Sequence, residues 1–458
     1  MTIKTASTTN KSALTISYAM NISSHQIELE NTKKIRLGIK ELPTKFTLPL
    51  ILRNIARVAK GIKEPLFEVD VDAWYILAKD LVTQEEFAEK IGYEIANAAY
   101  DFERYKKDVA KQTMALVTAD KNILTFVKRG LVIAEELNAA RELINTPGSH
   151  LPPAGLATHA TATAKSIPGI TVNVLDSKKM KALNMNAVLA VGESSANKPK
   201  FITLSYMGGK KSDKPYVFVG KGVTFDTGGS NLKPGDHMNG MHMDMAGGAI
   251  AIHTLAALAR LKVKKNIVAL VPAVENRVTG DSYLPGDVIV GMSGQAIEVL
   301  NTDAEGRVIL SDALTYAKRY DPSVVIDLAT LTGSSVAALG VRASAMFSKR
   351  DALLDTLKDL GEATKNLMWP LPLYDEYVED IKGDLGGFTN THNKMKRGGD
   401  VILGAMFLYQ FAKEYPWVHI DIAPRMESIG GDNLATGATG EPLYALVKFT
   451  ENVDIATI

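Results

Sequence analysis

The chain has 458 residues, of which 46% are hydrophobic and 22% charged, a composition typical of a folded globular protein with two or more domains. Its formal net charge of +1 gives no strong attraction to nucleic acid or to an acidic membrane, although a local binding groove is not excluded. The absence of cysteine excludes disulfides, thiolate nucleophiles and sulfur-ligated zinc sites, and it fits a reducing compartment.

The start of the sequence carries no signal for export. Residues 1–11 are polar and lack an apolar core followed by a cleavage site, so no signal peptide is expected. The longest apolar run, residues 249–259, is too short to cross a bilayer and contains His253. We therefore expect a cytoplasmic protein without a membrane segment.

Short apolar alternations and helical patterns are mixed in residues 13–125. Residues 14–18 and 66–71 alternate as strands do, whereas residues 85–105 have the helical period. No chemical motif stands out in this region. These patterns predict a small N-terminal α/β domain, which we assign to residues 1–127.

A longer helical pattern follows this region. Apolar side chains recur with the helical period from residue 128 to residue 145, and the stretch ends at Pro147-Gly148, a strong stop signal. Residues 128–147 are therefore predicted to form a helix that links two domains.

Strand-like and helix-like runs alternate from residue 148 to residue 458. The strand-like runs are residues 171–175, 201–206, 216–219, 267–271, 324–329 and 418–422. The helix-like runs are residues 154–165, 246–261, 308–319, 352–364 and 402–413. This alternation predicts a larger α/β domain over residues 148–458, in which a mixed, mostly parallel central sheet is flanked by helices. Such sheets bind their ligands at the carboxyl ends of strands.

The most informative segment is residues 301–308, which read Asn-Thr-Asp-Ala-Glu-Gly-Arg-Val. We expect Asp303 and Glu305 to lie on extended backbone, where side chains two positions apart point in the same direction. Arg307 follows at once, and an apolar helical pattern begins beside it. Clustered charges next to apolar residues are costly unless they bind something, and a metal ion is the simplest partner for paired carboxylates.

A second block of charged and glycine residues lies between residues 219 and 248. Lys221 and Asp226 follow the third strand-like run, and Lys233 comes soon afterwards. Asp244 precedes the next helix-like run, where a carboxylate suits the positive helix end. The glycines of the block let the backbone approach a ligand closely. Because these segments are connections at strand or helix ends, we expect their side chains to converge at one edge of the sheet.

The convergent set consists of Asp226, Asp244, Asp303, Glu305, Lys221 and Lys233. Four carboxylates this close together need cations, and two divalent ions supply the balancing charge. Two metals roughly 3.5–4 Å apart that share a water or hydroxide are a known hydrolytic device, in which the hydroxide attacks a carbonyl group. Lys233 is the candidate cation that stabilises the resulting oxyanion. Because the metals repel an ammonium group, one of the two lysines could be neutral and act as a nitrogen ligand.

Each of these residues has an ordinary structural explanation when it is taken alone. A lone aspartate near a helix start is most often an N-cap, and Lys221 between two glycines lacks the rest of a phosphate loop. His237 and His242 lie in the second block and could be ligands, although the oxygen ligands already suffice. The nearby methionines could fill the core or line an apolar pocket. The metal-site prediction depends on all the pieces occurring together.

Three further motifs accompany these blocks: Ala-Thr-Leu-Thr-Gly at 329–333, Trp-Val-His-Ile-Asp-Ile-Ala at 417–423 and Thr-Gly-Ala-Thr-Gly at 436–440. Together with residues 301–307 and the spacing of Lys221, Asp226, Lys233 and Asp244, they resemble the cytosol leucyl aminopeptidase family of dinuclear metallo-exopeptidases. The resemblance covers residues 140–450 and is weak over the first 125 residues.

The resemblance implies two divalent ions per subunit, Zn²⁺ or Mn²⁺ or both, with Mg²⁺ as a further candidate. The tighter-binding ion would be held by Lys221, Asp226, Asp244 and Glu305. The other ion would be held by Asp226, Asp303 and Glu305, with the backbone carbonyl of Asp303 contributing as well. Asp226 and Glu305 would therefore bridge the two ions.

The resemblance also implies two catalytic side chains and a substrate pocket. Lys233 would stabilise the tetrahedral intermediate, and Arg307 would hold a bicarbonate ion that works as general base. The pocket for the first substrate side chain would be lined by Met241, Thr330, Leu331, Gly333, Ala423 and Met426. Pro424 and Ser230 depart from the usual residues of the family, and their effect on specificity is open.

The activity implied by the resemblance is that of a leucyl aminopeptidase. Such an enzyme is a metal-dependent hydrolase that removes N-terminal amino acids, preferably leucine or another large apolar residue, from peptides by a two-metal-activated hydroxide. The family fold implies a small N-terminal α/β domain and a larger catalytic α/β domain, and the usual assembly is a homohexamer built from two trimers.

Two rival functions stay open on the sequence alone. One is a nucleic-acid-binding regulator, and the net charge of +1 argues against it. The other is a metal-dependent phosphoesterase, since paired metals also suit phosphoryl transfer. The lack of clear histidine ligands and the match over residues 301–308 disfavour the phosphoesterase.

Overall fold

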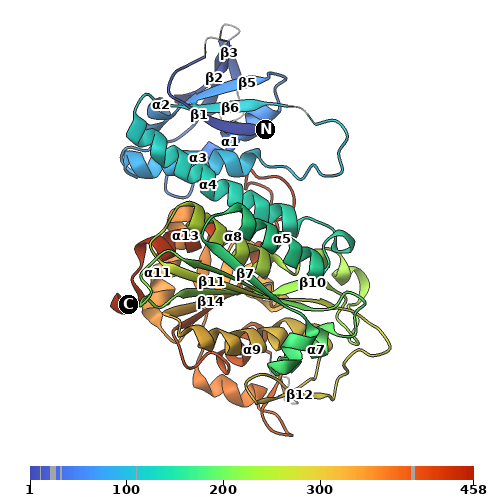
Figure 1. The fold of residues 1–458 in the computed structure, drawn as a ribbon. Helices are drawn as coiled ribbons and strands as arrows, with labels where there is room; N and C mark the ends of the chain where they lie inside the picture. The colour runs from blue at the N-terminus through green and yellow to red at the C-terminus, as the bar shows by residue number, and fades with distance from the viewer. Residues whose placement is uncertain (11, 21–26, 31–33, 110, 394–397) are drawn as a thin grey trace. The chain divides into compact units, whose positions relative to one another are not determined.

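The computed structural model describes residues 1–458 except residues 11, 21–26, 31–33, 110 and 394–397. The chain forms two compact units (Figure 1). The first unit contains Met1–Asn138 and Ser428–Gly437, and the second contains Ala139–Glu427 and Ala438–Ile458.

Helix α4 (Lys121–Ile144) carries the chain from the first unit into the second. It begins earlier than the hydrophobic period predicts. The reason is a local one, because Oδ1 of Asp120 accepts hydrogen bonds from the backbone N–H groups of Asn122 (2.7 Å) and Ile123 (3.4 Å). A carboxylate in this position caps a helix start, and periodicity alone does not register it.

The first unit is built on one sheet, whose described strands pair in the order β1-β6-β5-β2-β4-β3. These strands are β1 (Thr2–Ala6), β2 (Leu14–Met20), β3 (Ile27–Glu30), β4 (Lys34–Ile39), β5 (Leu66–Asp70) and β6 (Thr113–Val117). The helices are α1 (Leu48–Lys60), α2 (Val71–Tyr75) and α3 (Gln84–Ala99). Figure 1 shows α1 and α3 on the same face of this sheet. The predicted mixture of strands and helices is therefore present in this unit.

The second unit contains a larger sheet, whose described strands pair in the order β16-β15-β18-β14-β9-β11-β8-β7, with β10 paired to β11. Its strands are β7 (Ile170–Leu175), β8 (Lys200–Met207), β9 (Tyr216–Gly220), β10 (Gly222–Asp226), β11 (Asn266–Asn276), β14 (Val324–Ala329), β15 (Ser344–Phe347), β16 (Met368–Pro370) and β18 (Trp417–Asp421). A small sheet adds β12 (Val288–Val290), β13 (Ala296–Glu298) and β17 (Phe388–Thr389).

Helices cover both faces of the larger sheet. They are α5 (Pro153–Ser166), α6 (Ser177–Ala182), α7 (Asn186–Gly192), α8 (Ala246–Arg260), α9 (Glu305–Ala317), α10 (Gly333–Leu339), α11 (Asp351–Thr364), α12 (Asp400–Tyr409) and α13 (Leu443–Asn452). Figure 1 shows α5, α8, α11 and α13 on one side of the sheet, with α7 and α9 on the other. The predicted mixed α/β fold with a mostly parallel, helix-flanked sheet is confirmed.

The centre of the sheet is parallel and fully buried, as the sequence predicts. Strands β9, β11 and β14 are buried at every residue, and their mostly apolar sequences suit strands covered on both faces. Helix α8 packs directly on these strands. A Cβ added at Gly247 would lie 2.0 Å from the backbone oxygen of Leu328, so only glycine allows this close approach.

Several parallel strands end at the same edge of the sheet. In the parallel pairs, Leu328 lies opposite Gly220, Ala329 opposite Asp421, and Asp226 opposite Asn276. The connections that leave β9, β14 and β18 therefore begin side by side, as expected for the ligand-binding edge of an α/β sheet, and β10 extends beyond β9 along β11. Among the described residues, no helix is both long enough and apolar enough to span a membrane.

Candidate metal centre

The charged residues of the two sequence blocks lie on connections at this sheet edge. Lys221 lies between β9 and β10, and Asp226 is the last residue of β10. Asp244 follows the short turn η4 (Met241–Met243) and precedes α8. The segments are distant in sequence, but the parallel strands and α8 bring their side chains together.

The expectation of extended backbone at Asp303 and Glu305 is wrong. Asp303 lies in a 3₁₀ turn, η5 (Thr302–Ala304), and Glu305 is the first residue of α9. The Oδ1 atom of Asn301 caps this turn by accepting a hydrogen bond from the N–H of Asp303 (2.8 Å). The two carboxylates therefore converge because of a capped helix start, where a carboxylate also meets the positive helix end.

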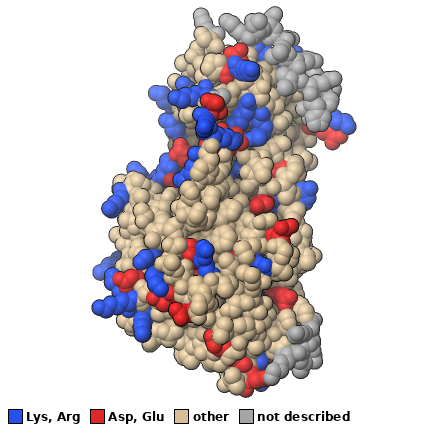
Figure 2. Space-filling view, turned by 90° about the vertical axis from the view of Figure 1, so that its right-hand side faces the viewer, with Lys and Arg blue, Asp and Glu red and all other residues tan. Residues whose placement is uncertain are grey.

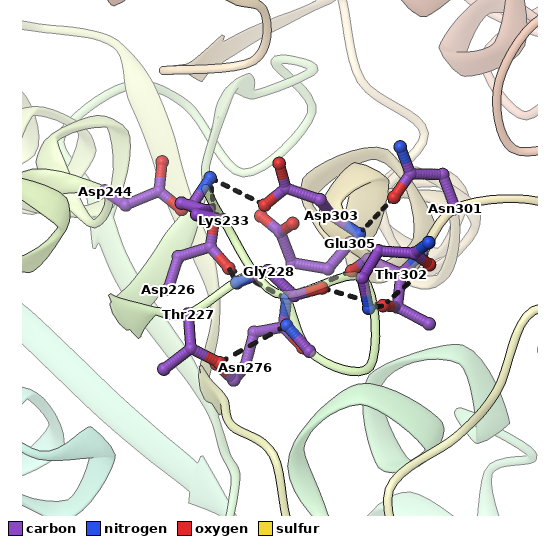
Figure 3. A network of polar contacts seen from close by, with 12 residues as sticks. Asp226, Thr227, Gly228, Lys233, Asp244, Asn276, Asn301, Thr302, Asp303 and Glu305 are labelled. Carbon is purple, nitrogen blue, oxygen red and sulfur yellow. Dashed lines mark hydrogen bonds and ion pairs between the residues drawn. The ribbon is translucent and has the colours of Figure 1, made fainter. Parts of the chain in front are cut away.

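Three carboxylates form the core of the cluster. Asp226, Asp244 and Glu305 each offer an oxygen such that these atoms lie within 4.8 Å of one another (Figure 3). All three side chains are buried. Among the described residues, this is the group of acidic or histidine side chains placed to hold a metal ion, and it contains neither His237 nor His242.

Lys221 lies on one side of the core. Its Nζ is 2.8 Å from Oδ1 of Asp244 and 2.9 Å from Oε1 of Glu305, and it donates to the backbone oxygen of Thr330 (3.0 Å). A Cβ added at Gly306 would lie 2.7 Å from Cε and 2.8 Å from Nζ of Lys221. The glycine of the 301–308 block therefore makes room for the lysine of the other block.

Lys233 lies on the other side and brings Asp303 to the cluster. Its Nζ is 2.8 Å from Oδ2 of Asp226 and 2.6 Å from Oδ1 of Asp303 (Figure 3). The side chain of Asp303 is 30% exposed, whereas those of Asp226 and Glu305 are almost fully buried. Asp303 therefore lies nearer to solvent than the other three carboxylates do.

The crowding of like charges shifts the acid–base equilibria of the site. Burial, followed by repulsion from Asp226, raises the pKa of Glu305 to about 8. Burial likewise raises the pKa of Asp244 to about 6. Burial alone would lower the pKa of Lys221, but its attraction to the surrounding carboxylates is larger and raises the pKa above the usual lysine value. The site thus holds more negative charge than its two lysines balance.

Two carboxylate oxygens at the core fit a metal ion. Oδ2 of Asp244 and Oε2 of Glu305 are buried without a hydrogen-bond partner among the described residues. A buried carboxylate oxygen without a hydrogen-bond partner destabilises the folded protein unless a cation binds it. Oxygen ligands of this kind suit Mn²⁺ and Mg²⁺, and Zn²⁺ also accepts them. The residues present therefore fit divalent metal.

Arg307 is buried on α9, two residues after Glu305. Its Nε has no hydrogen-bond partner among the described residues. A Cβ added at Gly404 would lie 3.3 Å from Nη2 of Arg307, which is a tight contact, so the glycine on α12 gives the guanidinium room. A planar cation with an unused donor is suited to a small oxyanion.

The residues predicted to line the substrate pocket lie in or beside η4, between β14 and the start of α10, and in or beside a turn after β18. Thr330 joins the carboxylate core directly, because its Oγ1 donates to Oδ1 of Asp244 (2.6 Å). Gly333 begins α10, and a Cβ added there would meet open space. Helix α10 packs against the turn η8 (Ala423–Arg425), which contains Ala423.

The two predicted pocket methionines lie on neighbouring turns. Met241 begins η4, directly after Gly240, and Met426 follows η8, directly before Glu427. A Cβ added at Gly240 would have Oε1 of Glu427 as its nearest neighbour, at 3.8 Å. The chain segments that carry Met241 and Met426 therefore approach each other.

Asp421 was missed by the sequence analysis, and it holds the segment after β14 against the segment after β18. Its Oδ1 accepts hydrogen bonds from the N–H groups of Leu331 (3.1 Å) and Ala423 (3.2 Å). Its Oδ2 accepts from Oγ1 of Thr332 (2.6 Å). The available signal was an acidic residue at the end of an apolar strand, within a motif already used for its overall match.

Asn276 and Tyr283 were missed as well. Both donate to the backbone oxygen of Thr302, Asn276 through Nδ2 (3.0 Å) and Tyr283 through its hydroxyl (2.8 Å). Asn276 is the last residue of the fully buried strand β11, and a polar residue at the end of an apolar run was the only signal in the sequence.

Comparison with known proteins gives matches to the region of the chain that contains the carboxylate cluster. The model of the cytosol aminopeptidase family, catalytic domain, matches residues 138–447. A probable cytosol aminopeptidase of Methylibium petroleiphilum is 48% identical over 325 residues, which are 71% of this chain and 66% of that relative. A probable cytosol aminopeptidase of an Azoarcus species is 44% identical over 366 residues, or 78% of this chain and 72% of the relative.

Solved structures are similar over nearly the whole chain. The bottromycin maturation enzyme BotP in complex with Mn superposes with a TM-score of 0.86 at 27% identity, covering 96% of this chain and 99% of the other. The cytosol aminopeptidase from Coxiella burnetii superposes with a TM-score of 0.84 at 26% identity, covering 97% of this chain and 98% of the other.

Proposed function

The chain belongs to the cytosol aminopeptidase family, and from this premise we propose that it removes N-terminal amino acids from peptides with the help of two divalent ions. Membership of the family supports a metallo-aminopeptidase, a hydrolase that acts on peptides. The observation that carries the proposal is the meeting of Asp226, Asp244 and Glu305 within 4.8 Å, with a lysine on either side.

The proposed ligands divide between two positions. Lys221, Asp226, Asp244 and Glu305 would hold one ion, and Asp226, Asp303 and Glu305 the other. The partnerless oxygens of Asp244 and Glu305 support this division, as does the position of Asp303 on the solvent side. Two bound ions would supply an activated water for attack on the peptide carbonyl. The Mn complex of the similar BotP supports a divalent ion, and Zn²⁺, Mn²⁺ and Mg²⁺ all stay candidates.

Two cationic side chains of the chain itself would act on the reacting groups. The Nζ of Lys233 lies between Asp226 and Asp303, and it would stabilise negative charge that develops on the substrate carbonyl oxygen. Arg307 would hold a bicarbonate ion as general base, and its buried, partnerless Nε supports an anion at this position.

The specificity proposed from the sequence is for leucine or another large apolar residue. The pocket would be lined by Met241, Thr330, Leu331, Gly333, Ala423 and Met426. Open space beside Gly333 and the convergence of the surrounding turns support a pocket there. The names of the relatives favour a cytosolic location for this chain too, and the homohexamer stays a prediction.

A blocked substrate tests the exopeptidase mechanism. The free amine of the substrate would bind one ion, so N-acetylation should abolish turnover. We expect a leucyl peptide to be hydrolysed and its N-acetylated form to be left intact, as measured by release of leucine over time. Equal rates on the two peptides would contradict the proposal. A leucyl anilide cleaved while a phosphate ester is left intact would also exclude the phosphoesterase.

Gly306→Ala tests whether the position of Lys221 matters for activity. The added methyl group would meet the buried lysine at 2.7–2.9 Å and displace it from Asp244 and Glu305. We expect peptide hydrolysis to fall roughly tenfold or more. Helix stability should hold or rise, since alanine favours a helix by up to about 1 kcal/mol over glycine.

The control for this variant is Gly280→Ala, where the added methyl group meets nothing within 4 Å. Initial rates and thermal unfolding of both variants should be compared with the unchanged protein. Unchanged hydrolysis by Gly306→Ala would argue against a role for Lys221 in the site.

Nucleic-acid binding gains no comparable support. The formal net charge is +1, and Figure 2 shows basic and acidic side chains intermixed on the second unit over the face it displays. Binding that depends on neutralised phosphates requires several cations gathered along one surface.

A further inference from the structure

We propose that Asn276 is a positioning residue that orients Asp226 and fixes the spacing between the two halves of the carboxylate cluster. The proposal rests on the function proposed above, and it assigns a role to a side chain that is not itself placed to bind metal. Its starting point is the polar network drawn in Figure 3, in which Asn276 lies between Asp226 and Thr302.

The sheet places Asn276 beside Asp226. Asn276 is the last residue of β11 and lies opposite Asp226, the last residue of the parallel strand β10. Its side chain is fully buried. Its backbone oxygen accepts hydrogen bonds from the N–H and the Oγ1 of Thr227, both at 2.9 Å, so both strand ends are held in register. The position of the Asn276 amide relative to Asp226 is therefore fixed by the sheet.

The amide of Asn276 determines which way the Asp226 carboxylate faces. Its Nδ2 donates to Oδ1 of Asp226 at 2.8 Å, and the N–H of Gly228 donates to the same oxygen at 2.9 Å. With Oδ1 engaged by two donors, the other oxygen, Oδ2, faces Lys233 at 2.8 Å. Asp226 is one of the two carboxylates shared by both proposed ion positions, so its orientation affects both.

The same Nδ2 atom reaches the segment that carries the remaining ligands. It donates to the backbone oxygen of Thr302 at 3.0 Å, and Thr302 directly precedes Asp303. The Oγ1 of Thr302 donates to the backbone oxygen of Gly228 at 2.7 Å, so a second hydrogen bond joins the segment after β10 to the turn before α9. One amide group thus links the end of β10 to the turn before α9.

An amide is the chemical group that this position needs. Both atoms that face Nδ2 are acceptors, a carboxylate oxygen and a backbone carbonyl oxygen. The other end of the amide, Oδ1, has no hydrogen-bond partner among the described residues, and a Cβ added at Gly229 would lie 2.8 Å from it. The hydrogen bonds of the Asn276 side chain therefore come from its donor end, Nδ2.

A merely structural role makes a different prediction. In that case Asn276 would only support the Thr302 turn, which the hydroxyl of Tyr283 also holds at 2.8 Å. Removal of either donor would then have the same consequence. If Asn276 acts through Asp226, its removal should weaken metal binding much more than removal of the Tyr283 hydroxyl.

The experiment compares Asn276→Leu with Tyr283→Phe in the full-length protein. Leucine has a similar size, removes the amide and adds no charge. Mn²⁺ is titrated into metal-free protein, and its affinity is measured by calorimetry. We expect Asn276→Leu to weaken Mn²⁺ binding by 10–100-fold, the range typical of partners that orient metal ligands. Tyr283→Phe should change it only a few-fold.

Thermal unfolding of the metal-free variants shows whether a substitution has changed folding rather than the site alone. If Asn276→Leu does not fold, Asn276→Ala is used in its place. The positioning role alone would be overturned if the Asn276 variant binds Mn²⁺ as tightly as the unchanged protein does. It would also be overturned if both variants lose Mn²⁺ affinity equally. If the protein of unchanged sequence binds none of Mn²⁺, Zn²⁺ and Mg²⁺, the proposed function is overturned, and the positioning role with it.

Discussion

Replacement of Glu305 by glutamine is expected to remove metal binding and peptide hydrolysis together. Glu305 is 1% exposed, lies 2.9 Å from Nζ of Lys221 and has one oxygen without a hydrogen-bond partner among the described residues. An amide at this position has no negative charge and a single oxygen to offer. Glu305 would bridge both ions. Its replacement should therefore reduce metal affinity and activity by more than the 10–100-fold typical of residues that only orient a ligand. We therefore expect hydrolysis to fall by roughly three orders of magnitude or more.

A second buried glutamate provides the matched control. Glu68 on β5 is 4% exposed, belongs to the first unit, and accepts a hydrogen bond from the backbone N–H of Asn10. Glu68→Gln should retain Mn²⁺ binding and the rate of hydrolysis of a leucyl anilide. Metal content after dialysis and initial rates measure both properties. A Glu305→Gln protein with full metal content and an unchanged rate would show that Glu305 is not a ligand.

Replacement of Lys233 by methionine should lower kcat and leave the metal in place. Methionine keeps the length of the side chain and removes its charge. Donors that stabilise a developing oxyanion contribute 10²–10³-fold to kcat in known cases, so a loss of roughly that size is expected. The metal should stay bound, because Lys233 is proposed to act on the substrate, although its Nζ pairs with Asp226 and Asp303 in this structure.

The matched comparison is Lys221→Met. Lys221 is proposed to hold one of the ions, so its replacement should lower metal content as well as kcat. Steady-state kinetics on a leucyl anilide, combined with metal analysis, distinguishes the two lysines. An increase in KM with unchanged kcat in Lys233→Met would count against charge stabilisation in the transition state. Metal loss in Lys233→Met equal to that in Lys221→Met would show that the two lysines share one role.

The parts of the fold that the sequence predicts are those in which one local pattern decides the structure. Strands β9, β11 and β14 are mostly apolar, and that pattern belongs to a covered parallel sheet. The candidate site followed from the same logic, because Lys221, Asp226 and Asp244 come directly after strands or before a helix. Once the sheet is parallel, these ends must meet at one edge.

The rest of the site depends on hydrogen bonds between segments that are far apart in sequence. The extended backbone expected at Asp303 and Glu305 gives way to a capped helix start, because the side chain of Asn301 accepts from the Asp303 N–H. Asn276 and Asp421 hold other segments through similar bonds to backbone groups. No local period or spacing marks a side chain whose partners lie tens of residues away.

The most direct test of the central claim is the anomalous scattering of manganese in crystals of the full-length protein prepared with Mn²⁺. We expect two peaks per chain, roughly 3.5–4 Å apart, with the carboxylates of Asp226 and Glu305 between them. A single peak, or two peaks too far apart for these carboxylates to touch both, would contradict the two-metal site.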